Sequence, residues 1–389
     1  MASIPTIWEI FRQFFWLGCI SFGGPAAHIG YFRTTFVERL HWLDDKAYAS
    51  LVALCQFLPG PASSQVGFSI GLRRGGLAGG IAAFVGFTLP SFVLMFALAV
   101  STTGNTSGLF SGIVSGLKLL AIVVVADAVV SMFRTFCKDT LTVTIAVLTA
   151  MSLWLVPDLW TQLIVLAAAA LAGFTAVTRH TAGTQSIQAL TPIRVNWLPL
   201  GIFIALFTGL PLLAFLSGWL SLFDDFFRTG SLVFGGGHVV LPLLQQMLTE
   251  VPDTDRFLLG YAAAQAVPGP MFTLATFLGA EVSPGAAISG ALLATLAIFL
   301  PGFLLILALQ GAWEALAARP SVTGAISGLN AAVVGLLMAA LYYPVFSNAV
   351  AVPADMALVL GGYMLLTRLK LPVVWLVVLF AVAGLVVVR

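Results

Sequence analysis

Two Pro-Gly-Pro triplets interrupt apolar stretches of the sequence, at residues 59–61 and 268–270. A proline lacks a backbone N–H and clashes with the preceding turn, so each triplet must separate two shorter helices. Pro61 and Pro270 are expected to open the second helix of each pair, because proline suits the first helical turn. The first N–H groups of such a helix have no intrahelical partner and bear about half a positive charge. They can bind an anion without any ionised side chain.

Two glycine-rich breaks, at residues 22–25 and 234–238, offer the same chemistry. Helices are expected to open at Pro25 and His238, so that four helix N-termini could converge and supply about two positive charges. The ligand that this arrangement suits is a small dianion. Histidine and glutamine side chains beside the breaks, and a lysine within an apolar stretch, could add hydrogen bonds or charge. The candidate substrate-binding residues are Gly23, Gly24, Pro25, His28, Gln56, Pro59, Gly60, Pro61, Lys118, Gly235, Gly236, Gly237, His238, Gln265, Pro268, Gly269 and Pro270.

These residues also have alternative explanations, which the sequence leaves open. The glycines and prolines could merely kink helices or permit close packing. Lys118 could extend its ammonium group to the membrane interface instead of meeting the anion. His28 and His238 could be hydrogen-bonded core residues, whereas titrating imidazoles could couple protons. Asp127 is expected to form an ion pair with Arg134, and proton transfer by Asp127 is the alternative.

The composition places these motifs in a membrane. Of 389 residues, 60% are hydrophobic and 8% are charged, with 17 Lys and Arg against 15 Asp and Glu. Soluble domains are about 25% charged, so a soluble enzyme is excluded, and the lack of a basic stripe excludes a nucleic-acid binder. The three separate cysteines provide neither a disulfide framework nor a metal site. The sequence contains no nucleotide-binding P-loop and no cofactor motif, so the chain is not its own ATPase.

Several stretches are long and apolar enough to be membrane-spanning helices. They are 76–101, 107–133, 159–178, 197–221, 284–310, 322–346 and 371–388, with two shorter stretches at 139–156 and 354–367. Four further segments, at 8–38, 46–72, 223–249 and 255–281, are apolar but broken near their middle. Each is expected to be a pair of half-length helices. The two that contain Pro-Gly-Pro are expected to be re-entrant hairpins with their tips near mid-membrane.

The broken segments belong to an internal repeat. Residues 18–24 match residues 230–236 at an offset of 212, and residues 56–61 match residues 265–270 at an offset of 209. Two further short motifs recur in the same order at nearly the same offset, which indicates a duplication. The predicted units are a first repeat at 1–178, a cytoplasmic linker at 179–196, a connecting transmembrane helix at 197–221 and a second repeat at 222–389.

The distribution of Lys and Arg indicates that the repeats are inverted, because positive residues collect in cytoplasmic loops. Such loops are marked by Arg73, Arg134 and Arg194 in the first half, and by Arg319 and Arg368 in the second. The predicted fold class is an all-α polytopic membrane protein with two inverted-topology repeats and broken or re-entrant helices. Such repeats typify secondary transporters, whose substrate binds at the repeat interface and whose halves rock to alternate access.

The ordered motifs resemble the bacterial chromate ion transporter family in its long, two-domain form. The matching residues are Phe22-Gly23-Gly24-Pro25 with His28, Gln56-Phe57-Leu58-Pro59-Gly60-Pro61 and Leu89-Pro90-Ser91-Phe92 in the first copy, and Phe234-Gly235-Gly236-Gly237-His238 with Val267-Pro268-Gly269-Pro270 in the second. Gly237 stands where the first copy has Pro25, so the two half-sites are expected to differ.

The resemblance implies a gradient-driven carrier in the bacterial inner membrane that exports chromate and confers chromate resistance. A carrier for sulfate or another oxyanion stays open as an alternative, as does a passive anion channel. The expected partners are a chromate-like or sulfate-like oxyanion and the lipid bilayer, with a homodimer as an open question. No nucleic acid, cofactor, metal or enzymatic activity is expected. The coupling ion and the direction of transport are open.

Overall fold

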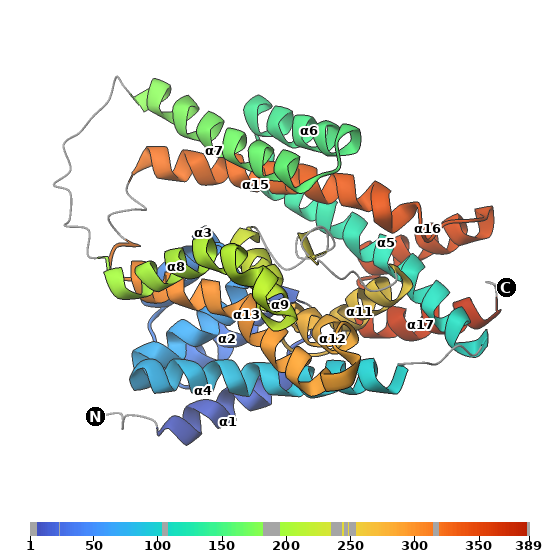
Figure 1. Cartoon of the computed structure of the whole chain (residues 1–389), viewed down its shortest axis with the longest axis horizontal. Helices are drawn as coiled ribbons and strands as arrows, with labels where there is room; N and C mark the ends of the chain where they lie inside the picture. The colour runs from blue at the N-terminus through green and yellow to red at the C-terminus, as the bar shows by residue number, and fades with distance from the viewer. Residues whose placement is uncertain are drawn as a thin grey trace.

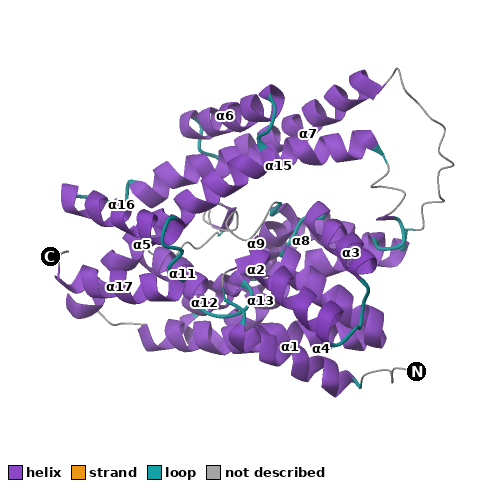
Figure 2. Cartoon of the chain, turned by 180° about the vertical axis from the view of Figure 1, so that it is seen from behind, coloured by secondary structure: helices purple, strands orange, loops and turns teal. Residues whose placement is uncertain are grey.

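The computed structural model describes residues 6–22, 24–102, 108–181, 195–234, 243–244, 248, 254–313 and 319–386. These residues are predominantly helical and contain no β-strand (Figure 2). Within them, five helices are long and apolar enough to cross a membrane, namely Ala62–Thr102, Gly112–Phe136, Trp197–Leu216, Pro284–Leu309 and Pro320–Tyr343. The predicted all-α, polytopic membrane fold is therefore confirmed.

The first half of the chain begins with short helices and continues with longer ones. They are α1 (Ile7–Ile20), α2 (Gly24–Phe32), the π-helix η1 (Arg33–Arg39), α3 (Asp45–Phe57), α4 (Ala62–Thr102), α5 (Gly108–Phe136), α6 (Thr140–Leu155) and α7 (Leu159–Thr181). Asp44 and Asp139 fix the starts of α3 and α6, because each carboxylate accepts a hydrogen bond from a first-turn N–H. Helix α4 leaves helical geometry at Gly75 and Gly76, and Gly71 then packs against Gly79. The predicted division between 46–72 and 76–101 is therefore confirmed.

The second half follows a similar order. Its elements are α8 (Trp197–Leu213), the 3₁₀-helix η2 (Ala214–Leu216), α9 (Gly218–Leu232), α11 (Thr254–Ala266), η4 (Met271–Thr273), α12 (Leu274–Glu281), η5 (Pro284–Ala286), α13 (Ala287–Leu309), α15 (Pro320–Ala340), the π-helix η6 (Leu341–Phe346), α16 (Pro353–Thr367) and α17 (Val373–Val386). The helix predicted at 197–221 ends earlier, because Ser217 caps α9 by accepting a hydrogen bond from the Trp219 N–H. Helix α17 has 14 residues, fewer than the roughly 20 of a full span.

The helices form two bodies, and each body takes helices from both halves of the sequence (Figure 1). The broken-helix body contains α1–α4 with α8, α9, α12 and α13. Here α1 packs on α4, and α13 packs on α9 and α12. The long-helix body contains α5–α7 with α15–α17, where α6 and α7 pack on α15 and α17 packs on α5. Helix α11 lies between the bodies, in contact with α5 and α17 on one side and with α4 and α12 on the other.

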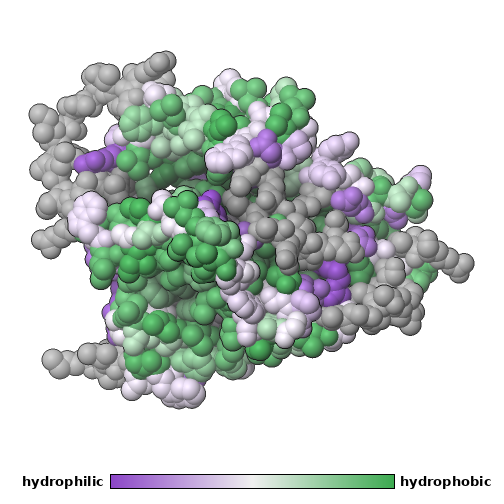
Figure 3. All heavy atoms as spheres, viewed as in Figure 1, coloured by the Kyte–Doolittle hydropathy of each residue, from purple (hydrophilic) through white to green (hydrophobic). Residues whose placement is uncertain are grey.

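The outer surface is strongly apolar. For example, Trp197, Leu198 and Leu212 of α8 are exposed, as is Phe215 of η2. Figure 3 shows apolar side chains spread widely over α8, α13 and α4. A soluble monomer rarely exposes apolar patches this extensive, because water contact would be unfavourable. The surface is the kind that faces lipid. Because the outer surface is apolar, the groups that could bind a polar ligand must lie in the interior.

Candidate substrate site at the Pro-Gly-Pro segments

Both Pro-Gly-Pro segments separate two helices, as predicted, and the helix after the first segment is the part of α4 before its break at Gly75 and Gly76. The first connects α3 to α4, and the second connects α11 to η4 and α12. Gly60 and Gly269 have positive φ angles of 119° and 98°, which L side chains rarely adopt. Pro61 and Pro270 directly precede the following helices, so the prediction that they lie in the first turn is wrong by one residue. The Pro61 carbonyl oxygen accepts the N–H of Gln65 at 2.9 Å, which makes Pro61 the cap of α4.

Each Pro-Gly-Pro segment is hydrogen-bonded to the other half of the chain. The Gly60 N–H donates to the Val233 carbonyl oxygen at 2.7 Å, and the Gly269 N–H donates to the Ser21 carbonyl oxygen at 2.9 Å. Ser21 and Val233 occupy matching places, since each caps the helix before a glycine-rich break, α1 and α9 respectively. The two bonds are therefore equivalent, and each joins the tip of one half to a helix end of the other half. They attach the first tip to the end of α9 and the second tip to the end of α1.

Matched glycines hold the flanking helices at close range. A Cβ atom on Gly18 would lie 2.6 Å from the Phe87 carbonyl oxygen, and a Cβ atom on Gly230 would overlap the Ile298 carbonyl oxygen. Gly18 therefore lets α1 contact the backbone of α4, and Gly230 lets α9 contact the backbone of α13. Both glycines begin the repeated motif noted in the sequence. The motif thus fixes the position of each helix end by close backbone packing.

His28 is buried, at 1% exposure, and connects several parts of the site. Its Nε2 lies 3.2 Å from the Ser21 carbonyl oxygen, and its Nδ1 lies 3.2 Å from the Ser63 Oγ. Because a carbonyl oxygen only accepts, Nε2 carries the proton, and a neutral ring then accepts from the Ser63 hydroxyl at Nδ1. The ring also meets Phe87 edge-on, with 5.2 Å between centroids. This arrangement favours the hydrogen-bonded core explanation, in which His28 positions α2 against α1 and α4.

Gln65 is a site residue that the sequence analysis missed. Its side chain is fully buried, and its Nε2 donates to the carbonyl oxygens of Pro59 at 2.9 Å and of Gly302 at 3.3 Å. Gln65 thereby clamps the first Pro-Gly-Pro segment to α13. Leu274 occupies the matching position of the second repeat, so the repeated motifs could not reveal it. The available signal was an amide side chain in an apolar helix, one turn after a proline break.

The other predicted polar residues lie in different environments. Gln56 is exposed on α3, whereas Gln265 hydrogen-bonds to Tyr261 within α11. Lys118 is largely buried and forms an ion pair with Asp255, which belongs to α11. A lysine neutralised by a carboxylate attracts an anion less strongly than a lone cation would.

The expected ion pair between Asp127 and Arg134 is wrong. No ion pair joins these two residues in the part of the chain that the structure describes. Both instead line a cavity of about 650 Å³ between α5 and α16, together with Arg368. Asp127 therefore stays a candidate for proton transfer. In the sequence it lies far from both Pro-Gly-Pro segments.

Several predicted site residues cannot be placed. Gly23 lies outside the described residues, as does the second break at Gly235, Gly236, Gly237 and His238. Gly24 begins α2, and Pro25 lies in its first turn, close to the expected helix start. Pro268 is buried, while Pro59 is partly exposed. Among the described residues, no group of three or more His, Cys, Asp or Glu could hold a metal ion.

Comparison with known proteins adds the family. A family model described as "Chromate transporter" matches the chain twice, at residues 8–174 and 220–385. The chain belongs to the chromate transporter family. It is 28% identical to a chromate transport protein of Pseudomonas aeruginosa over 340 residues, which cover 85% of this chain and 79% of that protein. It is 26% identical to a chromate transport protein of Cupriavidus metallidurans over 397 residues, covering 99% of this chain and 94% of that protein.

An archaeal relative extends the comparison. An uncharacterized transporter of Methanocaldococcus jannaschii is 26% identical over 347 residues, covering 86% of this chain and 83% of that protein. No solved structure matches the chain. As a chromate transporter family member, the chain is a multi-pass membrane transporter and not an enzyme. The site at the Pro-Gly-Pro tips is therefore considered as a place for a transported ion and not for a reaction.

Proposed function

We propose that this member of the chromate transporter family is a secondary carrier that exports chromate from the cytoplasm across the bacterial inner membrane. The exchanged hydrogen bonds, from Gly60 to Val233 and from Gly269 to Ser21, support this most directly. They tie each Pro-Gly-Pro tip to a helix end of the other half, inside a helical bundle with an apolar surface. Two relatives are named chromate transport proteins. Export of a toxic oxyanion would make the cell resistant to it.

The site suits a tetrahedral dianion held mainly by backbone groups. Helix α4 begins at Ala62, directly after the first tip, so its first N–H groups lack partners within the helix. The start of η4 at Met271 offers a similar end after the second tip. Partial charges of about one half attract an oxyanion but bind it less tightly than a fixed cation. A carrier must also release its substrate, and moderate binding favours that step.

The motion that alternates access is proposed to lie between the two bodies. Rocking of one sequence half against the other would break the bonds at Gly60 and Gly269, because these bonds tie the halves together. Movement of the broken-helix body against the long-helix body would keep both bonds intact. The bodies meet through α11, whose contacts with α5 and α17 could change during transport. We therefore replace the rocking of halves with a movement of bodies.

The energy source is proposed to be an ion gradient, since the sequence contains no P-loop for ATP. Either protons or a counter-anion such as sulfate could drive the exchange. The inverted orientation of the repeats at 1–178 and 222–389 stays a prediction, as does the linker at 179–196. The helix expected at 197–221 ends at Leu213, and its role as the connection between the repeats stays a prediction. The homodimer also stays a prediction. A measurement of the mass of the purified protein in detergent would test it.

The test is chromate flux into proteoliposomes that contain the purified chain. An imposed pH gradient or an internal sulfate load should drive chromate accumulation above the external concentration. Protein-free liposomes and liposomes with a collapsed gradient are the controls. Equilibration without uphill accumulation would instead identify an anion channel. Uptake of sulfate but not chromate would identify a carrier for another oxyanion, and everted membrane vesicles would give the direction.

A further inference from the structure

Four buried polar atoms near the first Pro-Gly-Pro segment have no hydrogen-bond partner among the described residues. They are Ser21 Oγ, Ser64 Oγ, Gln65 Oε1 and Thr88 Oγ1, and their residues are between 0% and 4% exposed. Buried polar groups in proteins are nearly always paired, so an unpaired cluster requires an explanation. Three of the four atoms are hydroxyl groups, which can donate to an anion.

Ser21 and Ser63, the residue before Ser64, contact the same histidine. His28 bonds to the Ser21 carbonyl oxygen through one ring nitrogen and to Ser63, the neighbour of Ser64, through the other. Ser64 lies in the first turn of α4, directly after the Pro-Gly-Pro segment. The Ser21 carbonyl oxygen also accepts the Gly269 N–H of the second tip. Through His28, both residues therefore lie where the second tip meets the N-terminus of α4.

Thr88 reaches the same junction from the second part of α4. Its carbonyl oxygen accepts a hydrogen bond from the Ser91 Oγ at 3.0 Å. Ser91 in turn lies beside the second tip, because a Cβ atom on Gly269 would come within 2.9 Å of the Ser91 Oγ. Thr88 thus lies one helical turn from a residue that contacts the tip. The three residues thus lie around the Pro-Gly-Pro tips, at the end of α1, in the first turn of α4 and in the second part of α4.

Elsewhere among the described residues, no other buried hydroxyl is left without a hydrogen-bond partner. The usual partner of a helical hydroxyl is the carbonyl oxygen four residues earlier in the same helix. Pairs of this kind, each at 2.7 Å, are Thr229 with Asp225, Ser231 with Phe227 and Thr295 with Ala291. Ser64 and Thr88 are also helical, yet their hydroxyls make no such bond. Ordinary helical pairing therefore does not account for them.

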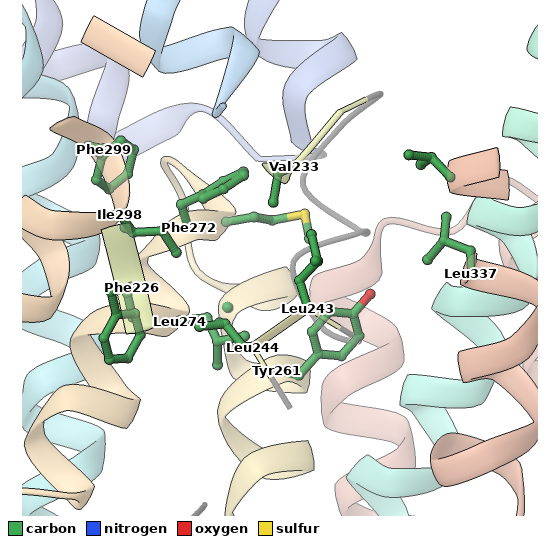
Figure 4. Packing of buried hydrophobic residues seen from close by; sticks show 14 of the residues in the cluster. Phe226, Val233, Leu243, Leu244, Tyr261, Phe272, Leu274, Ile298, Phe299 and Leu337 are labelled. Carbon is green, nitrogen blue, oxygen red and sulfur yellow. The ribbon is translucent and has the colours of Figure 1, made fainter. Parts of the chain in front are cut away.

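At the four matching positions, all of them described, the second repeat has no free hydroxyl. Val233 stands at the position of Ser21, Leu274 at that of Gln65 and Phe299 at that of Thr88. Figure 4 shows these three side chains, with Phe272, as part of the hydrophobic packing. Ser64 has a hydroxyl counterpart in Thr273, but that group donates to the Pro270 carbonyl oxygen at 2.8 Å. The duplicated site is therefore polar on one side and apolar on the other.

We infer that Ser21, Ser64 and Thr88 form the hydrogen-bonding face of the substrate site and donate to the oxygens of the bound oxyanion. The second repeat contributes backbone groups and an apolar wall. This inference rests on the proposed function and specifies its site. Gln65 Oε1 is an acceptor, so it suits a hydroxyl or water rather than an unprotonated oxyanion oxygen. The apolar wall keeps competing water away from the hydroxyls, which strengthens their bonds to the anion.

The test compares the variants Ser64→Ala and Thr88→Val with Thr229→Val, a matched control whose hydroxyl bonds within its own helix. The KM for chromate uptake into proteoliposomes should rise about tenfold in each site variant, because a hydrogen bond to a charged ligand is lost. The maximal rate should stay within about twofold of wild type. The control should keep the wild-type KM, and Thr88→Ser, which retains the hydroxyl, should as well.

Thermal unfolding without substrate separates binding from a structural role. Removal of an unpaired buried hydroxyl should leave the unfolding temperature unchanged or raise it, while stabilisation by added chromate should diminish. Unchanged KM in both site variants, or a lower unfolding temperature without any change in KM, would overturn the inference. Failure of the wild-type protein to take up chromate would instead overturn the proposed function, so the two failures are distinguishable.

Discussion

Gly60 and Gly269 each meet two demands that other residues do not. Their φ angles are positive. A Cβ atom added to Gly60 would lie 3.1 Å from the Gly302 Cα, and one added to Gly269 would lie 2.9 Å from the Ser91 Oγ. We expect Gly60→Ala and Gly269→Ala each to lower the free energy of unfolding by about 1–3 kcal/mol through backbone strain. Chromate uptake should fall several-fold, because the N–H of residue 60 would shift away from the Val233 carbonyl oxygen and that of residue 269 away from the Ser21 carbonyl oxygen.

The control for this prediction is Gly201→Ala in α8, where an added Cβ atom would meet open space. Thermal unfolding in detergent and chromate uptake per reconstituted protein are the two measurements. The control should match wild type in both, since alanine favours a helix over glycine. If both tip variants took up chromate at the wild-type rate, the tips would not be part of the substrate site.

At the scale of elements, the end of α9 is held in place by its contact with α13. A Cβ atom on Gly230 would overlap the Ile298 carbonyl oxygen, and a backbone atom cannot move aside as a flexible side chain can. We expect Gly230→Ala to lower the free energy of unfolding by about 1–3 kcal/mol, as overpacking does. It should also reduce uptake, because α9 ends at Val233, the acceptor of the Gly60 N–H. Gly209→Ala in α8, at an uncrowded position, is the matched control, and equal unfolding temperatures of the two variants would contradict the prediction.

The sequence predicts the broken helices well because their cause is local. Proline chemistry ends α3 before residue 59 and α11 before residue 268 without reference to the rest of the fold. The pairing of Gln65 with Gly302, across 237 residues, has no such local signal. The same holds for the ion pair of Lys118 with Asp255, whose partners lie in different repeats. Which helices form each body depends on complementary side chains, and a single sequence does not show that complementarity.

At the scale of the whole molecule, matching helices make different contacts. Helix α11 packs against α5 of the long-helix body, whereas its counterpart α3 packs on α4 and η1. Among the described residues, α3 makes no comparably extensive contact with α15, the counterpart of α5. Unequal contacts between matching elements are expected of a transporter that is closed on one side of its site. With the proposed inverted topology, we expect an opposite state that forms the α3–α15 contact and releases α11 from α5.

The ion pair between Lys118 and Asp255 stabilises the state that the structure shows, because it joins α5 to α11. Lys118→Met should remove about 1 kcal/mol from this state, given that Asp255 is half exposed, and so shift the ratio of the two states about fivefold. The maximal rate of chromate uptake should change accordingly, with little change in KM. The charge-exchanged double variant, Lys118→Asp with Asp255→Lys, should recover most of the wild-type rate, since it rebuilds the pair with reversed polarity. A double variant no better than the single one, with wild-type unfolding temperatures in both, would show that the pair does not set the balance between states.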